Sequence, residues 1–129
     1  MSKIVELLKK SGYSKKAIEY FVKKTNVGEI KDASVFFSFT GPCGDTIEIY
    51  LKIKHGIIKQ AKFQATGCAG AFASGSALCE IIKGKTLDQA KNIKKQEIIK
   101  SLGGLPGLKI HCACLAKTTL NKAIEKYLK

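Results

Sequence analysis

The most restrictive feature of the sequence is a clean two-residue alternation over residues 46–54. The apolar positions in this segment are Ile47, Ile49, Leu51 and Ile53. Because successive side chains of a β-strand point to opposite faces, the pattern predicts a strand with one buried and one wet face. The flanking sequence must then supply partner strands and a layer of other elements that covers the apolar face.

Partner strands are predicted on both sides of this segment. Before it, the alternating apolar residues are Val35, Phe37 and Phe39. After it, His55-Gly56 makes a tight turn into a third strand, residues 57–65, and His55 is expected to be exposed there. The shared face of the third strand is predicted to carry Ile57, Ala61, Phe63 and Ala65. The three strands together predict an antiparallel meander.

Helices are predicted before and after the meander. A short apolar face covers residues 2–10, and Ser14 can cap a second helix. The sequence AGAFASGSALCEIIK begins just after the third strand, and its small residues allow a helix to pack very closely on the sheet. Thr86 and Gln89 match a capping box, which predicts a short helix after them. Further helices are predicted over residues 95–102 and over the last 18 residues.

The predicted fold is therefore α+β. Residues 1–129 form a single domain, in which several helices pack on a small three-stranded antiparallel sheet and a long helix ends the chain. Residues 1–14 form an N-terminal extension or an extra helix.

Net charge does not identify a partner. The formal charge is +13, but all 23 basic residues are Lys. Lys lacks the planar fork with which Arg reads guanine and grips phosphate, and dispersed Lys residues usually cover a solvated face. We expect no specific nucleic-acid binding, although an acidic partner protein could be attracted.

No membrane segment or signal peptide is expected. The sequence begins MSKIVELLKKSGY, whose apolar run is too short for a signal peptide, and no apolar stretch approaches 18 residues. We therefore expect a cytoplasmic protein. Thiols stay reduced in the cytoplasm, so an odd set of five cysteines favours metal or sulfur chemistry over disulfides.

Three of these cysteines are predicted to lie where regular elements begin or end. They are Cys43, Cys68 and Cys112. The last two would start helices, where the dipole and the free N–H groups favour a thiolate. Soft sulfur suits an iron–sulfur cluster or zinc, and Asp45 and His111 add harder ligands to the same site. Residue chemistry alone leaves open metal binding, buried structural thiols and a nucleophilic cysteine without metal.

The two remaining cysteines have weaker signals. Cys79 lies well inside a predicted helix, and we interpret it as a packed thiol. Cys114 follows Cys112 by two residues, and it is either an accessory ligand or persulfide relay, or a spectator.

These features together resemble the IscU family, also known as the NifU N-terminal domain. The matching motifs, in chain order, are Asn26-Val27-Gly28, Cys43-Gly44-Asp45, Gly67-Cys68, Ala73-Ser74, Gly84-Lys85, Leu87-Asp88 with Ala90, Leu105-Pro106, Lys109-Ile110-His111-Cys112 and Leu115-Ala116. The resemblance covers about residues 17–128. Each motif is weak alone, but their order and spacing are highly specific.

The resemblance implies a noncatalytic scaffold for a transient [2Fe-2S] cluster. The implied cluster ligands are Cys43, Cys68 and Cys112, with Asp45 or His111 as a further ligand. The resemblance also implies that Cys112 receives sulfur as a persulfide from a cysteine desulfurase, with Lys109 close enough to stabilise the anionic sulfur. An iron donor, recipient apo-proteins and a homodimer belong to the same interpretation, and the purified site could hold iron or zinc.

The sequence departs from the family's usual pattern at the motif that an Hsp70 chaperone recognises. The family's usual Leu-Pro-Pro-Val-Lys signal for an Hsp70 reads Leu105-Pro106-Gly107-Leu108-Lys109 here. Release assisted by an Hsp70/J-type chaperone is therefore in doubt.

Two other functions compete with the scaffold. A zinc-loaded sulfur acceptor of a transferase system would use the same ligands, but the extra segment typical of that branch of the family is absent between the second and third cysteines. A structural or nucleic-acid-binding module would use the cysteines only for packing.

Overall fold

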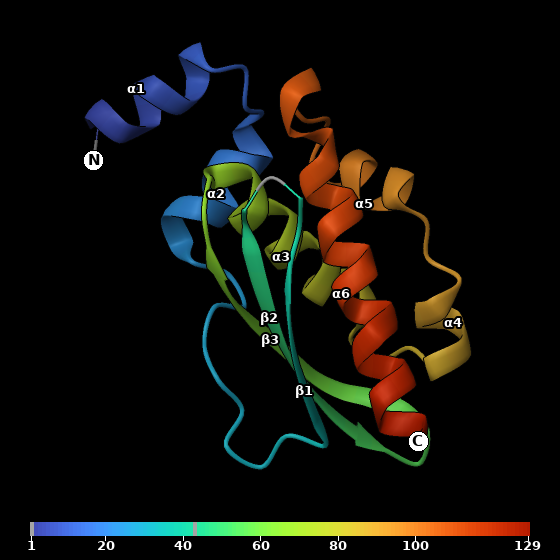
Figure 1. The fold of residues 1–129 in the computed structure, drawn as a ribbon. Coiled ribbons are helices and arrows are strands. Elements are labelled where there is room, and N and C mark those ends of the chain that lie inside the picture. The colour runs from blue at the N-terminus through green and yellow to red at the C-terminus, as the bar shows by residue number, and fades with distance from the viewer. Residues whose placement is uncertain (1, 43) are drawn as a thin grey trace.

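A computed structural model of the chain describes residues 2–42 and 44–129. Its strands are β1 (Val35–Thr40), β2 (Thr46–Lys54) and β3 (Ile57–Thr66). Its helices are α1 (Ser2–Lys10), α2 (Lys15–Lys23), α3 (Ala69–Ile82), α4 (Leu87–Lys91), α5 (Lys95–Ser101) and α6 (Ile110–Leu128), with a 3₁₀ turn at Gly107–Lys109. Figure 1 shows helices α2 to α6 gathered around one small sheet, with α1 extending away from it and α6 running alongside it to the C-terminus. The predicted α+β class is confirmed.

The sheet is the predicted antiparallel meander, in the order β1-β2-β3. Ile49 on β2 lies between Phe37 on β1 and Phe63 on β3. The inward residues of β2 are almost completely buried, as the alternation predicted.

The face predicted for the start of β3 is wrong in one respect. Ile58, rather than Ile57, is fully buried there. The pairing of β2 with β3 shifts register between Lys52 and Ile53, which marks a β-bulge. Because a shift of one residue moves side chains to the opposite face, Ile58 enters the core while Ala61 and Phe63 also point inward.

The structure contains the helix-capping contacts that the sequence predicted. The Ser14 hydroxyl accepts a hydrogen bond of 3.0 Å from the Ala17 N–H at the start of α2. Thr86 and Gln89 form the reciprocal capping box of α4. Gly84, with φ at +85°, follows Lys83, the C-cap residue of α3, in a conformation that favours glycine.

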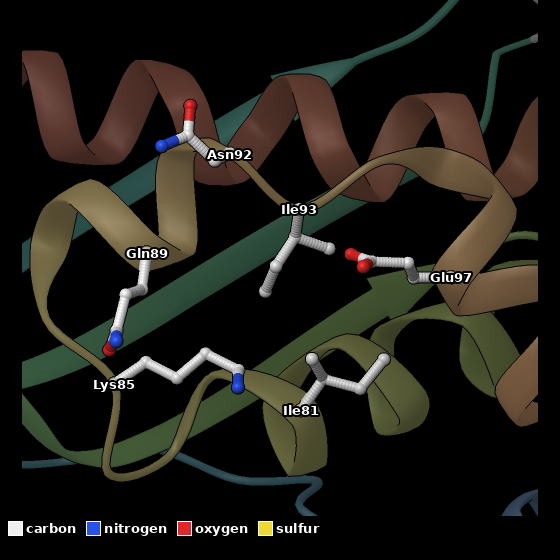
Figure 2. Close-up of a pocket in the computed structure, with 6 residues that line it drawn as sticks. All are labelled: Ile81, Lys85, Gln89, Asn92, Ile93 and Glu97. Atoms are coloured by element: carbon white, nitrogen blue, oxygen red, sulfur yellow. The ribbon is translucent and has the colours of Figure 1, made fainter.

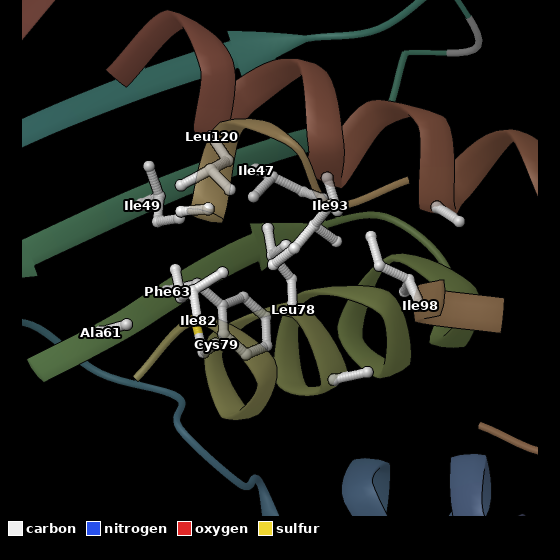
Figure 3. Close-up of a cluster of buried hydrophobic side chains, with 14 of the residues drawn as sticks. Ile47, Ile49, Ala61, Phe63, Leu78, Cys79, Ile82, Ile93, Ile98 and Leu120 are labelled. Carbon is white, nitrogen blue, oxygen red and sulfur yellow. The ribbon is translucent and has the colours of Figure 1, made fainter. Parts of the chain in front are cut away.

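A single core lies between the sheet and the two longest helices. Helix α3 packs against β3 and helix α6 against β1 and β2, and the two helices also contact each other. Figure 3 shows the buried Phe63 ring beside Leu78, Cys79 and Ile82 of α3. A Cβ added at Gly75 would lie 2.6 Å from carbons of the Phe63 ring. Glycine therefore allows the close packing of α3 that the small residues predicted.

The C-terminal helix is buried along one face. Leu115, Leu120 and Ile124 lie in the core. Leu128 is 61% exposed and Tyr127 is also exposed, so the buried face ends before the last residues of the helix.

None of the helices in the described ranges combines the length and the apolar character needed to cross a lipid bilayer.

We predict that Gly75→Ala lowers the free energy of unfolding by about 1–2 kcal/mol, because overpacking costs about 1–3 kcal/mol and exceeds the gain in helix propensity of about 1 kcal/mol. Urea denaturation followed by circular dichroism measures the change. Gly107→Ala is the control, since an added Cβ there meets no atom within 4 Å. Equal stability of Gly75→Ala and the native protein would contradict the close contact with Phe63.

Candidate metal centre

The end of the sheet nearest the starts of α3 and α6 gathers four potential ligands. The β2–β3 register pairs Thr46 with Thr66, so the residues just outside the pair, Asp45 and Gly67, lie side by side. Cys68 follows as the N-cap of α3. His111 and Cys112 lie in the first turn of α6, which packs against α3. Residues that are far apart in sequence therefore meet at one end of the fold.

The distances between these groups are those of ligands around one site. The Cys68 and Cys112 sulfurs lie 3.6 Å apart, and the Cys68 thiol donates a hydrogen bond of 3.3 Å to Asp45 Oδ2. The Cys112 sulfur lies 3.7 Å from His111 Nε2. One ligand atom from each of Asp45, His111 and Cys112 falls within 4.8 Å of the other two. Tetrahedral ligands at about 2.3 Å from a metal lie about 3.8 Å from one another, so the donor set fits a metal ion or a small cluster.

Cys43, the first predicted ligand, lies outside the described residues, and its role stays a prediction. Two hydrogen bonds join the described residues on either side of it. The Gly41 N–H donates to the Asp45 carbonyl at 2.9 Å, and the Gly44 N–H donates to the Gly41 carbonyl at 3.0 Å. These bonds hold the backbone of Asp45 at the mouth of the site.

Two glycines create the space in which the ligands approach each other. Gly67 has φ at +140°, and a Cβ there would overlap the Asp45 carboxylate. A Cβ at Gly70 would lie 3.0 Å from the Cys112 sulfur and 3.3 Å from the Lys109 Cβ. Larger side chains at either position would push the ligands apart.

Burial dominates the electrostatics of Cys112. Its side chain is 0% exposed. Burial first, and then the neighbouring charge of Cys68, raises the pKa of the Cys112 thiol to about 12, while the positive charge of Lys109 acts in the opposite direction. The expected effect of the helix start is therefore outweighed at Cys112 in the metal-free protein. A bound cation reverses this balance, because a thiol that coordinates a metal is deprotonated.

Sequence reasoning missed Tyr13. This residue follows α1, is 9% exposed, and its hydroxyl oxygen lies 3.3 Å from the position of a Cβ added at Gly70. Burial first, followed by the nearby charges of Cys68 and Cys112, raises the pKa of Tyr13 to about 12. No periodicity or spacing in the sequence links Tyr13 to cysteines so far along the chain. A signal that could have drawn attention to it is Gly12, which fits a helix stop just before it.

The other candidate residues have clear positions. Cys114 is half-buried and lines a hollow of about 210 Å³ with His111, Phe39 and Pro42. Its role as an accessory ligand stays a prediction. Cys79 is fully buried, and burial raises its pKa to about 12, so the expected packed thiol is confirmed. His55 is exposed in the β2–β3 turn, as predicted.

A separate hollow of about 340 Å³ lies between α3, α4 and α5 (Figure 2). Its lining residues are Ile81, Lys85, Gln89, Asn92, Ile93 and Glu97. This lining contains no sulfur or imidazole, so the metal-ligand chemistry described above belongs to the other site.

Fold and site define a class of protein: a small α+β domain that gathers thiol, imidazole and carboxylate groups at one end of its sheet. The sequence matches the family described as the NifU-like N-terminal domain over residues 12–129. The chain belongs to this family, so the resemblance inferred from the motifs is confirmed. Helix α1 lies before the matched region.

Relatives of known name support the assignment. The chain is 42% identical over 118 residues to the iron-sulfur cluster assembly scaffold protein IscU 1 of Archaeoglobus fulgidus, a match that covers 91% of this chain and 77% of that protein. It is 39% identical over 120 residues to the iron-sulfur cluster assembly scaffold protein IscU of Escherichia coli, covering 89% of this chain and 93% of that protein.

Solved structures show the same fold. A putative iron-sulfur cluster assembly scaffold protein for the SUF system from Fervidobacterium islandicum superposes with a TM-score of 0.72 at 24% identity, covering 87% of this chain and 96% of that one. The N-terminal part of a NifU-like protein from Brucella abortus gives a TM-score of 0.72 at 18% identity, covering 92% and 95%.

We predict that iodoacetamide near neutral pH labels Cys114 faster than Cys79 by on the order of 100-fold or more. Cys79 should react slowly because it is fully buried and because its raised pKa leaves little of the reactive thiolate. Mass spectrometry of tryptic peptides measures both rates in one sample. Labelling in urea is the control and should make the rates similar. Fast labelling of Cys79 in the folded protein would show that the contact of α3 with the sheet opens readily.

Proposed function

We propose that the protein is a scaffold on which an iron–sulfur cluster is assembled and from which it passes to apo-proteins. The observation that carries the proposal is the meeting of Asp45, Cys68, His111 and Cys112 at one end of the fold. The names of the relatives, which cover most of this chain, support the same role. A scaffold needs ligands that bind iron and sulfide and then give them up, and a mixed set of soft and hard ligands suits that task.

The ligand roles follow from the chemistry of the donors. We assign Cys43, Cys68 and Cys112 as thiolate ligands of a [2Fe-2S] cluster that is cargo rather than a resident cofactor. Asp45 supplies a hard carboxylate that binds iron less tightly than sulfur does, and His111 is an alternative nitrogen ligand. The resulting weak position lets a recipient protein displace the scaffold.

Cys112 is the proposed sulfur acceptor, and a cysteine desulfurase is the proposed donor. The Cys112 thiol loses its proton, and the thiolate attacks the terminal sulfur of the donor's persulfide. A new S–S bond forms as the donor's S–S bond breaks, and the donor cysteine leaves as a thiolate that takes up the proton. Lys109 lies beside the site, and its charge favours the anionic form of Cys112. Because Cys112 is buried, the donor must first displace the side chains that cover it.

The remaining partners are proposed from the same role. An iron donor and apo-proteins of the cytoplasm are the expected partners, and a homodimer could bridge one cluster. The surplus of Lys suits an acidic face of the desulfurase, an attraction that added salt should weaken. We propose neither a specific nucleic acid nor an Hsp70/J-type chaperone as a partner.

A zinc-loaded sulfur acceptor is the second candidate, since the distances among the ligands also suit one tetrahedral zinc ion. Such a protein would accept sulfur at Cys112 without building a cluster.

We predict that anaerobic reconstitution with iron and a cysteine desulfurase gives visible charge-transfer bands and nearly equal iron and sulfide. Each of Cys43→Ser, Cys68→Ser and Cys112→Ser should lose the bands, because each removes a thiolate ligand. Cys79→Ala is the matched control, since this thiol lies in the core and should leave assembly unchanged. The absorption spectrum and the iron and sulfide contents are the measurements.

Two results of this experiment would contradict the scaffold. Retention of zinc alone by the native protein would favour the sulfur acceptor. Persulfide transfer that persists in Cys112→Ser would remove Cys112 as the acceptor.

We further predict that Asp45→Ala slows transfer of the cluster to an apo-ferredoxin by about 10-fold, because the displaceable carboxylate is lost and softer ligands hold the iron. Visible circular dichroism follows the transfer. Asp88→Ala is the control, since Asp88 is exposed on α4, away from the site. Unchanged or faster transfer in Asp45→Ala would show that the carboxylate does not make the cluster labile.

A further inference from the structure

Strand β1 forms one edge of the sheet, because the strand order is β1-β2-β3. It contains no charged residue and no proline in the sequence VFFSFT. Natural proteins usually protect an edge strand with charged side chains or proline, because its free backbone groups can pair with another chain. The composition of β1 therefore leaves its own edge suited to pairing.

The backbone groups of β1 that point away from β2 can be identified from a hydrogen bond at its end. The Gly41 N–H donates to the Asp45 carbonyl, in the same register as the pairing of β1 with β2. Hydrogen-bonded and non-hydrogen-bonded positions alternate along an antiparallel pair. The N–H and C=O groups of Phe36, Ser38 and Thr40 therefore point outward from the sheet.

A side-chain contact agrees with this direction. The Lys126 ammonium, on α6, donates a hydrogen bond of 2.9 Å to the Phe36 carbonyl. In the described part of the chain, no such contact reaches the outward groups of Ser38, and both Ser38 and Thr40 are exposed. The middle of the edge is thus open to solvent.

Two aromatic side chains on the inner face of β1 are incompletely covered. Phe37 and Phe39 pack against the core but stay half-buried. Their partners on β2, Ile49 and Ile47, are almost completely buried. A further strand beside β1 would cover exposed parts of both rings, and the burial of apolar surface favours its addition.

Two lysines of α6 lie at the same edge. The Lys122 ammonium lies 5.3 Å from the centre of the Phe39 ring, and the Lys126 ammonium is bound to the Phe36 carbonyl. Neither lysine forms an ion pair with a carboxylate of the described residues. The charge at this edge is therefore positive and available to a partner.

The spacing of the two lysines suits an extended acidic segment. Residues four apart on a helix lie on one face with a rise of about 6 Å. Side chains on one face of a strand repeat at about 6.8 Å. Acidic residues at alternate positions of an added strand can therefore each meet one lysine. A second copy of this chain fits less well, because it would bring Lys122 and Lys126 of both copies to a shared edge.

We propose that the outer edge of β1 is a docking site for an extended, acidic segment of a partner protein, which adds to the sheet as a fourth strand. Main-chain hydrogen bonds to the outward groups of β1 supply affinity. Carboxylates at alternate positions of the segment meet Lys122 and Lys126 and supply specificity. The segment displaces Lys126 from the Phe36 carbonyl.

The edge lies next to the metal centre. Strand β1 ends at Thr40, and Phe39 lines the hollow of about 210 Å³ that also contains His111 and Cys114. A partner that docks here therefore has its chain close to the candidate ligands. The inference does not depend on the proposed function, because the addition of a strand needs neither metal nor cluster.

The first test uses the metal-free full-length protein and a seven-residue peptide in which glutamate and valine alternate, with both ends blocked. NMR measures hydrogen exchange of the backbone amides. At saturating peptide, exchange of the Ser38 N–H should slow by about 10-fold or more. The same peptide with N-methylated amides is the control, because it keeps the carboxylates and lacks backbone donors. Unchanged exchange at Ser38 with the first peptide would overturn the proposal.

The second test measures the charge requirement by fluorescence anisotropy of the labelled peptide. The double variant Lys122→Glu with Lys126→Glu should weaken binding by about 10-fold or more, because attraction becomes repulsion at two positions. The double variant Lys95→Glu with Lys100→Glu is the matched control, since both lysines are exposed on α5 and the change in net charge is the same. Equal weakening in both double variants would show a nonspecific attraction and overturn the proposal.

The remaining outcomes identify another occupant or separate this inference from the scaffold. Protection of the Ser38 N–H that rises with protein concentration, without peptide, would place a second copy at the edge and overturn the proposal. Specific binding of the peptide, together with failure of the native protein to build a cluster with a desulfurase, would support the docking site and overturn the scaffold.

Discussion

The close contact between α3 and β3 determines the position of the site. Gly75 lies against the Phe63 ring at a distance that a Cβ could enter only if the packing shifted, and so sets how deeply α3 sits on the sheet. Cys68 is the N-cap of this helix, and α6 packs against it with His111 and Cys112 in its first turn. The ligand sulfurs therefore come within 3.6 Å of each other as a result of core packing, without a covalent link.

Glycines also create the space that the site needs. Gly67 and Gly70 leave room for the Asp45 carboxylate and the Cys112 sulfur, so the ligands can approach each other. In the empty site the buried Cys112 thiol resists ionisation, so a metal must displace its proton on binding. A cation that binds the folded site and not the unfolded chain stabilises this end of the fold, which couples its stability to occupancy.

Sequence reasoning succeeded where the governing interactions are local. The alternation over residues 46–54, the Ser14 cap and the capping box of Thr86 all depend on neighbours within a few residues, and all were predicted. The bulge that brings Ile58 inward depends on pairing between two strands, which a single segment does not encode. The proximity of Tyr13 to the cysteines and the suppressed ionisation of Cys112 depend on tertiary burial. Motif order predicted the family because it combines many weak local signals.

The last helix supplies both a cover for the sheet and half of the described ligands. While the chain is being synthesised, the apolar faces of β1 and β2 stay open until α6 emerges, and no complete set of ligands exists before that moment. Metal in the cell thus meets either an unfinished chain that lacks a full donor set or a finished domain. Because His111 and Cys112 lie at the start of α6, the donor set is complete only once this helix has packed against α3.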